Sequence, residues 1–136
     1  MDDLPAEPPP EALIESGRRS DAVEGPRGSM RAAIANAMVG LKKELYGRGP
    51  ERAKAYLNDE FVFVVLEGGL TRNEETLLAA GEEELVRSYR LRFQEVVAAP
   101  ATAAIEEIVG RRVVTYHSQI VFDPPLAFEI FVLEPE

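Results

Sequence analysis

The sequence predicts an α+β domain of two layers, with a small, mostly antiparallel three-stranded sheet packed against two main helices and a few short helices. Two spacings of apolar residues along the chain predict this fold class. Apolar residues recur at three- and four-residue steps over 30–46 and 82–99, as on one face of an α-helix. They run together or alternate over 61–66 and 113–133, as in β-strands. The length of 136 residues and the hydrophobic fraction of 46% fit one domain with its own core.

Residues 1–28 are predicted to be a disordered, acidic, proline-rich tail ahead of a single domain at 29–136. The segment holds seven acidic residues, three arginines and five prolines, but few large apolar side chains. Too little apolar surface is therefore available to offset the conformational entropy that folding removes. We interpret the tail as a solvated leader, and the alternative is an arm that binds a partner.

The first two helices are expected on either side of Gly47. Ser29 is the expected N-cap of a helix over 30–46, whose apolar stripe consists of Met30, Ile34, Ala37, Met38, Leu41 and Leu45. Gly47 suits the left-handed residue that ends a helix. Pro50 suits the first position of a short second helix, which Asn58-Asp59 would end.

The strand over 61–66 reads Phe-Val-Phe-Val-Val-Leu and is apolar on both faces, which predicts cover on both sides. After it, Thr71 and Glu74 have the spacing of a capping box. They predict a short helix that reaches Ala80 and ends at Gly81.

A long helix is expected to begin near Glu82 and to break or kink at Pro100, with a last helical piece that Gly110 caps. The C-terminus is expected to form a hairpin from 113–122 and 127–133. Alternation places one set of residues of its first strand on a common face: Val114, Tyr116, Ser118, Ile120 and Phe122.

The composition excludes several classes of function. The chain has no cysteine, which excludes a disulfide, and its single histidine argues against a structural zinc site, so we expect no metal and no cofactor. The net charge of −9 argues against a nucleic-acid binder. No apolar run approaches the ~20 residues of a membrane-spanning helix, and the acidic N-terminus lacks the pattern of a secretory signal. We therefore expect a cytoplasmic protein that does not insert into a membrane.

The segment Gly47-Arg48-Gly49-Pro50 is the candidate ligand-contacting loop. Free amides at the start of the helix after Pro50 would attract an anion, and Arg48 and Arg52 would add charge and paired donors. Arg90, on the flank of the apolar face of the long helix, would complete a basic site. The simpler interpretation is that the loop only separates two helices and that the arginines form surface ion pairs.

Catalysis is not predicted. His117 and Ser118 are neighbours on a strand, so their side chains point to opposite faces and cannot form a dyad. His117 would need Asp123 or Glu129 across the hairpin, and a half-exposed strand histidine is the preferred interpretation. We assign no catalytic residue and predict that the protein is not an enzyme.

Taken in chain order, these features resemble one bacterial family. The shared pattern consists of Gly-Arg-Gly-Pro at 47–50, the apolar strand at 61–66, Leu70-Thr71 with Glu74, the long helix with Arg90, Gly110-Arg111-Arg112-Val113, and the strand with His117. It resembles the MpsC family, formerly a domain of unknown function and now named for a sodium-translocating, membrane-potential-generating system. The resemblance spans about 30–133, so the predicted domain is MpsC-like throughout.

The resemblance implies a small cytoplasmic accessory or regulatory component of a membrane complex that handles cations or inorganic carbon, with a transporter subunit as partner. It implies no reaction and no catalytic residue. The alternative, which comes from the residues alone, is a small anion- or nucleotide-binding sensor that uses the 47–50 loop. Because the strand at 61–66 needs cover on both faces, we also predict a homodimer.

Overall fold

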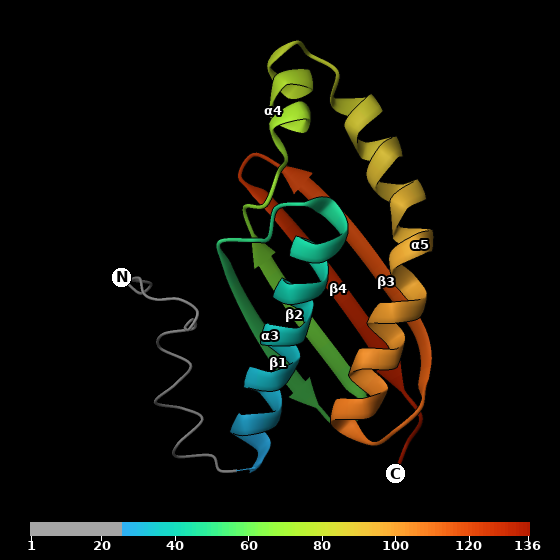
Figure 1. Cartoon of the computed structure of the whole chain (residues 1–136). Helices are drawn as coiled ribbons and strands as arrows, with labels where there is room; N and C mark the ends of the chain where they lie inside the picture. Colours follow the sequence, from blue (N-terminus) through green and yellow to red (C-terminus); the bar gives the residue numbers. More distant parts are fainter. Residues whose placement is uncertain (1–25) are drawn as a thin grey trace.

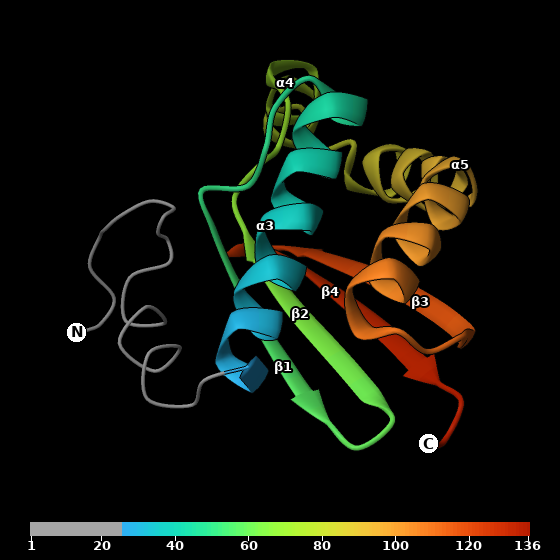
Figure 2. The same cartoon turned by 60° about the horizontal axis from the view of Figure 1, so that its bottom comes forward.

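The computed structural model describes residues 26–136, and in this part of the chain an antiparallel sheet carries helices on one of its faces (Figure 1). The elements in chain order are α3 (Pro26–Tyr46), β1 (Arg52–Asn58), β2 (Phe61–Glu67), α4 (Arg72–Ala79), α5 (Glu83–Val109), β3 (Val113–Phe122) and β4 (Pro125–Leu133). Helix α3 packs on β1 and α5 packs on β3, whereas α4 stands beyond the end of the sheet (Figures 1 and 2). The α+β class is confirmed. The predicted tail lies, up to residue 25, outside the described residues.

The sheet has four strands in the order β1-β2-β4-β3, and the prediction of three was wrong. The additional strand is β1, where we expected a short helix after Pro50. Its inward residues Ala53, Ala55 and Leu57 have the two-residue period of a strand and pair with β2. The turn at Asp59-Glu60 joins the two strands, and Asp59 takes a positive φ of 55° there. Pairing with the apolar β2 therefore outweighs the helix-start signal of the proline.

The C-terminal hairpin forms as predicted, with one local difference. Val113 pairs with Leu133 and Thr115 with Val132, so one residue is bulged out between them. That residue, Val114, is exposed, so the expectation that it shares a face with Tyr116 and Ser118 is wrong. Beyond the bulge Tyr116, Ser118 and Ile120 face the helices, in register with Phe131, Glu129 and Ala127.

Both main helices are longer than predicted. Helix α3 includes Ser29 instead of beginning after it. Helix α5 runs through Pro100 without the expected break. The missing proline N–H costs one backbone hydrogen bond, but Val97, Ala101 and Ile105 on either side of it are fully buried. Their packing keeps the helix on both sides of Pro100 against the core, so it continues without a break.

The core lies between the sheet and the two long helices. Its fully buried members include Ile34, Met38, Val62, Val64, Val97, Ile105 and Phe131. No helix of residues 26–136 covers the opposite face of the sheet (Figures 1 and 2). The expectation that both faces of the strand at 61–66 are covered is therefore not met within this part of the chain.

No helix in the described part of the chain combines the length and the apolar character that crossing a bilayer requires.

Candidate functional site

A small polar cleft lies at the end of the sheet where α3 ends, β2 leaves the sheet and β4 begins. It consists of two adjoining hollows that share Lys42, Tyr46, Arg90, Ile120 and Ala127. One hollow extends to Arg48, Pro50 and Gly69, and the other to Gln94, Ser118 and Gln119. The larger has an internal volume of ≈ 20 Å³, which is about the space that one water requires. We call this site the polar cleft.

Arg90 is held on one side of the polar cleft by Glu74. Its Nε donates to Glu74 Oε2 at 2.6 Å, and its Nη2 donates to Glu74 Oε1 at 2.5 Å and to the Gly69 carbonyl at 3.3 Å. The capping box predicted from the sequence also binds this carboxylate, because the Thr71 amide donates to Glu74 Oε1 at 2.9 Å. In the reciprocal bond of the box, the Glu74 amide donates to Thr71 Oγ1 at 3.2 Å. Burial alone raises the pKa of Glu74, but the hydrogen bonds from Arg90 and Thr71 outweigh it and lower that pKa below its usual value.

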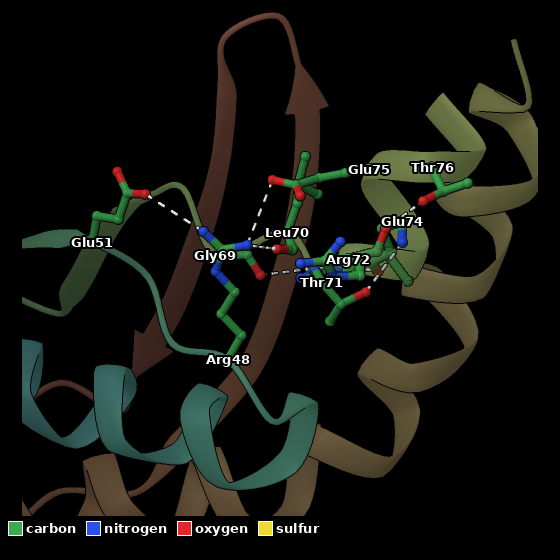
Figure 3. A network of polar contacts seen from close by, with 10 residues as sticks. Arg48, Glu51, Gly69, Leu70, Thr71, Arg72, Glu74, Glu75 and Thr76 are labelled. Carbon is green, nitrogen blue, oxygen red and sulfur yellow. Dashed lines mark hydrogen bonds and ion pairs between the residues drawn. The ribbon is translucent and has the colours of Figure 1, made fainter. Parts of the chain in front are cut away.

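Arg48 extends from the loop after α3 to the start of α4 (Figure 3). Its Nη1 donates to the Leu70 carbonyl at 2.9 Å and lies 3.5 Å from Glu75, while Nη2 lies 3.8 Å from Glu51. The side chain is 46% exposed, so it faces solvent at the mouth of the cleft, as the loop hypothesis requires. These contacts connect the 47–50 loop to the segment between β2 and α4.

Two glycines allow this close approach of the loops. Gly47 ends α3 with a φ of 83°, and its amide donates to the Lys43 carbonyl at 3.0 Å, which confirms the predicted left-handed cap. Gly69 has a φ of 88°, and a Cβ on it would lie 3.1 Å from the Pro50 Cα. A side chain at Gly69 would therefore force the two loops apart.

Glu129 forms the other polar cluster, deeper in the molecule. Its side chain is 0% exposed, and its Oε2 lies 3.1 Å from the Lys42 Nζ, itself 8% exposed. Ser118 Oγ donates to Oε2 at 2.9 Å, and the Tyr116 hydroxyl donates to Oε1. Burial and the charge of Glu129 raise the pKa of Tyr116 well above its usual value.

Tyr46 lies between the two clusters. The Arg90 Cζ lies 4.2 Å and the Lys42 Nζ 5.3 Å from the centroid of its ring, both within the range of a cation–π contact. Burial raises the pKa of Tyr46 to about 12, although the nearby Arg90 acts in the opposite direction. Its phenol therefore stays protonated at neutral pH. A chain of contacts leads from Glu74 through Arg90, Tyr46 and Lys42 to Glu129.

The structure brings together most of the site residues predicted from the sequence, but it places Arg52 elsewhere. Arg48, Pro50 and Arg90 line one hollow of the polar cleft, and Gly47 and Gly49 belong to the same loop. Arg52 lies instead in β1, where it pairs with Glu67 at 3.0 Å. The helix whose free amides were to attract an anion does not exist, because these residues form a strand and the Glu51 amide donates to the Glu67 carbonyl at 2.7 Å.

Sequence reasoning missed Lys42 and Glu129 as members of the site. Lys42 looked like an ordinary cation near a helix C-terminus. Glu129 carried a usable signal, since it is the one charged residue in β4 and its parity places it inward with Ala127 and Phe131. Such a carboxylate requires a buried partner.

His117 takes no part in the polar cleft. It is exposed on the other side of β3, and its Nε2 lies 3.1 Å from Thr115 Oγ1. The considered pairing with Glu129 is wrong, because Glu129 points inward to Lys42. Within residues 26–136 no cluster of three His, Asp or Glu side chains is suited to hold a metal ion.

Comparison with known proteins relates the described domain to one family. The family model described as "Na+-translocating membrane potential-generating system (MpsC)" matches residues 26–135. The chain is also similar to the "Uncharacterized protein YrhF" of Bacillus subtilis (strain 168), with 28% identity over 96 residues, which are 69% of this chain and 79% of the relative. No solved structure matches the chain.

Proposed function

This chain belongs to the MpsC family, and we propose that it is a non-catalytic accessory or regulatory component of a membrane system that moves sodium or another cation. In this proposal it acts on the cytoplasmic side and binds a membrane-spanning subunit of that system. The family description supports the link to sodium and membrane potential. The residues of the polar cleft support the absence of a catalytic role, as follows.

The polar side chains in and next to the polar cleft are engaged with one another. Glu74 is held by Arg90, and Glu129 is held by Lys42, Tyr116 and Ser118. A general base needs a pKa near the working pH and access to a substrate proton. Tyr46 and Tyr116 have raised pKa values instead. The Ser118 hydroxyl donates to the Glu129 carboxylate, which Lys42 and Tyr116 already bind, and not to a histidine. This mutual engagement is the observation that favours a structural role of the polar residues over a catalytic one.

The test is deletion of the gene in the native host, with membrane potential and growth followed over a range of external sodium concentrations. We expect the deletion to lower the membrane potential in a sodium-dependent manner, and the full chain supplied in trans to restore it. A tagged full chain, captured from detergent-solubilised membranes, should enrich a membrane-spanning subunit of a cation-moving complex. A deletion strain with normal potential at every sodium concentration would contradict the proposal.

The second candidate is a sensor of a small inorganic anion. The observation that favours it is the meeting of Lys42, Arg48 and Arg90 around one cleft. The cleft has internal room for about one water, which disfavours a nucleotide, so a small anion such as phosphate or bicarbonate would bind at its mouth, against the half-exposed Arg48. In a thermal-shift experiment either anion should then raise the Tm of the full chain, and the variant Arg48→Ala should lose this response.

Arg92, which is exposed on α5, provides the matched control, since Arg92→Ala removes the same charge away from the cleft. Arg48→Ala also separates the two candidates in the host. It should restore the deletion strain if the protein is an accessory that does not depend on the anion, and it should fail to restore the strain if anion sensing is the function.

A further inference from the structure

The face of the sheet that points away from the helices is the largest feature that the proposed function leaves unused. On this face the two central strands, β2 and β4, present apolar side chains at every position except Glu67, the last residue of β2. They are Phe61, Phe63, Val65, Leu126, Phe128, Ile130 and Val132. Phe61 is 48% exposed and Ile130 is 38% exposed. The rings of Phe63 and Phe128 stack with centroids 6.1 Å apart, so the patch is continuous across both strands. We call this surface the outer face.

The two edge strands give the outer face a polar rim. On β1 the rim carries Arg52 and Lys54, and on β3 it carries Thr115, His117 and Gln119. An apolar centre with a polar rim is the usual anatomy of a protein interface. The two rims differ in composition, since the β1 rim carries an arginine and a lysine and the β3 rim carries neither.

Acidic side chains are scarce on the outer face, although the chain as a whole has a net charge of −9. Among the outward-pointing residues of the four described strands, only Glu67 is acidic, and it pairs with Arg52 at 3.0 Å. Two copies of an acidic protein repel each other least where their acids are fewest. The charges of the outer face therefore do not oppose the approach of a second copy.

We propose that the outer face binds the outer face of a second copy of this chain, with a two-fold axis that runs parallel to the strands between β2 and β4. Such an axis reverses the strand order of the second sheet, so that β1 of one copy lies over β3 of the other. The rim with Arg52 and Lys54 then meets the rim with Gln119, which holds no lysine or arginine. An in-plane axis perpendicular to the strands would place β1 over β1 and bring the two basic rims together.

The size of the outer face sets the strength of this dimer. Four strands about 4.8 Å apart, each about seven residues long at roughly 3.4 Å per residue, give a projected area of about 450 Å² per copy. Two copies together approach the lower limit of about 1,000 Å² for a specific interface. We therefore expect a weak dimer that forms as the protein is concentrated.

The first test is the mass of the full chain in solution, by light scattering or sedimentation from low micromolar to near-millimolar concentration. The mass should rise from the 15.0 kDa of one chain toward twice that value. Phe61→Lys and Ile130→Lys, both at half-exposed positions of the outer face, should weaken association at least about tenfold, because each buries a charge in the apolar centre. Val96→Lys is the control, since Val96 is 59% exposed on α5, and it should leave association unchanged.

Circular dichroism and the Tm of each variant show whether it still folds, so that a loss of association is read only from folded protein. The proposal is overturned if the full chain keeps the monomer mass at every concentration. It is also overturned if Val96→Lys abolishes the dimer and the outer-face variants do not, because the contact then lies on α5. A dimer that appears only after removal of residues 1–25 would show that this segment, and not a second copy, occupies the face.

The second test determines the direction of the axis. The chain has no cysteine, so any disulfide cross-link must form between the introduced cysteines. Lys54→Cys and Gln119→Cys lie in the same cross-strand row, at the β1 and β3 rims. A mixture of the two single variants should cross-link faster than either variant alone. Faster cross-linking of Lys54→Cys with itself would overturn the proposed axis.

Discussion

Glu74 and Glu129 are two buried carboxylates that the chain stabilises in different ways. Glu74 lies in the first turn of α4 and receives a backbone amide from Thr71 in addition to the guanidinium of Arg90. Glu129 lies in a central strand, and Lys42, Tyr116 and Ser118 bind it through side chains only. A backbone amide remains when side chains are changed. The Glu129 cluster should therefore be the more sensitive of the two to single substitutions.

The largest expected effect is that of Lys42→Met. Among residues 26–136, Lys42 is the cation that pairs with Glu129, so its removal leaves a buried charge without that partner. Breaking a buried pair in this way costs about 3–5 kcal/mol of unfolding free energy. Denaturant unfolding at neutral pH measures it. Lys43→Met, at the exposed neighbouring position, should change stability by about 0.5 kcal/mol or less. Equal effects of the two variants would mean that the Lys42–Glu129 pair does not stabilise the fold.

Arg90→Leu should have a smaller effect, about 2–3 kcal/mol, because the Thr71 amide continues to bind the Glu74 carboxylate. The same unfolding measurement applies, with Arg92→Leu as the control on an exposed part of α5. If Arg90→Leu proved more costly than Lys42→Met, the proposed role of the backbone amide would be wrong.

The pH dependence of stability sharpens the comparison further. The pKa of Glu74 is lower in the folded protein than in the unfolded chain. Its contribution is therefore complete above the unfolded value of about 4.3 and disappears as the pH falls through the lowered folded value. The Tm of the full chain, followed from neutral pH down to about pH 3, should decline over this range. The decline should be shallower for Glu74→Gln, and parallel curves would contradict the prediction.

The smallest expected effect is that of Thr71→Ala, which removes one half of the capping box. Loss of such a cap typically costs about 1 kcal/mol. Thr76→Ala is the matched control, because Thr76 is an exposed threonine in the same helix whose hydroxyl bonds only to the Arg72 carbonyl. A loss of stability for Thr76→Ala as large as that for Thr71→Ala would show that the cap itself contributes little.

The sequence was informative where structure depends on near neighbours. The capping box of Thr71 and Glu74, the glycine caps at Gly47 and Gly110, and the strand at 61–66 were all predicted and are present. These features depend on residues three or four positions apart, or on a single residue's backbone preference. MpsC membership was likewise predicted from the order of short motifs and is confirmed.

The errors arise where a distant segment decides the outcome. Strand β1 forms because it can pair with the edge of β2, and this pairing cannot be predicted from Pro50 or the following residues alone. Helix α5 continues through Pro100 because the core holds residues on both sides of it. The Lys42–Glu129 pair joins the first described helix to the last strand, so only the fold brings the two residues together. The sequence therefore predicted Arg48 and Arg90 as site residues, but it did not predict the deeper Lys42–Glu129 pair.

The strand order β1-β2-β4-β3 has a consequence for how quickly the chain folds. The β1–β2 and β3–β4 pairs are hairpins between consecutive strands, whereas the β2–β4 pair joins segments separated by α4, α5 and β3. Closing a long loop is entropically unfavourable, and this must happen before the contacts it permits can compensate. Formation of the β2–β4 seam should then set the rate of folding. Val64 and Glu129 face each other across that seam, so the step that limits folding is also the one that encloses a carboxylate.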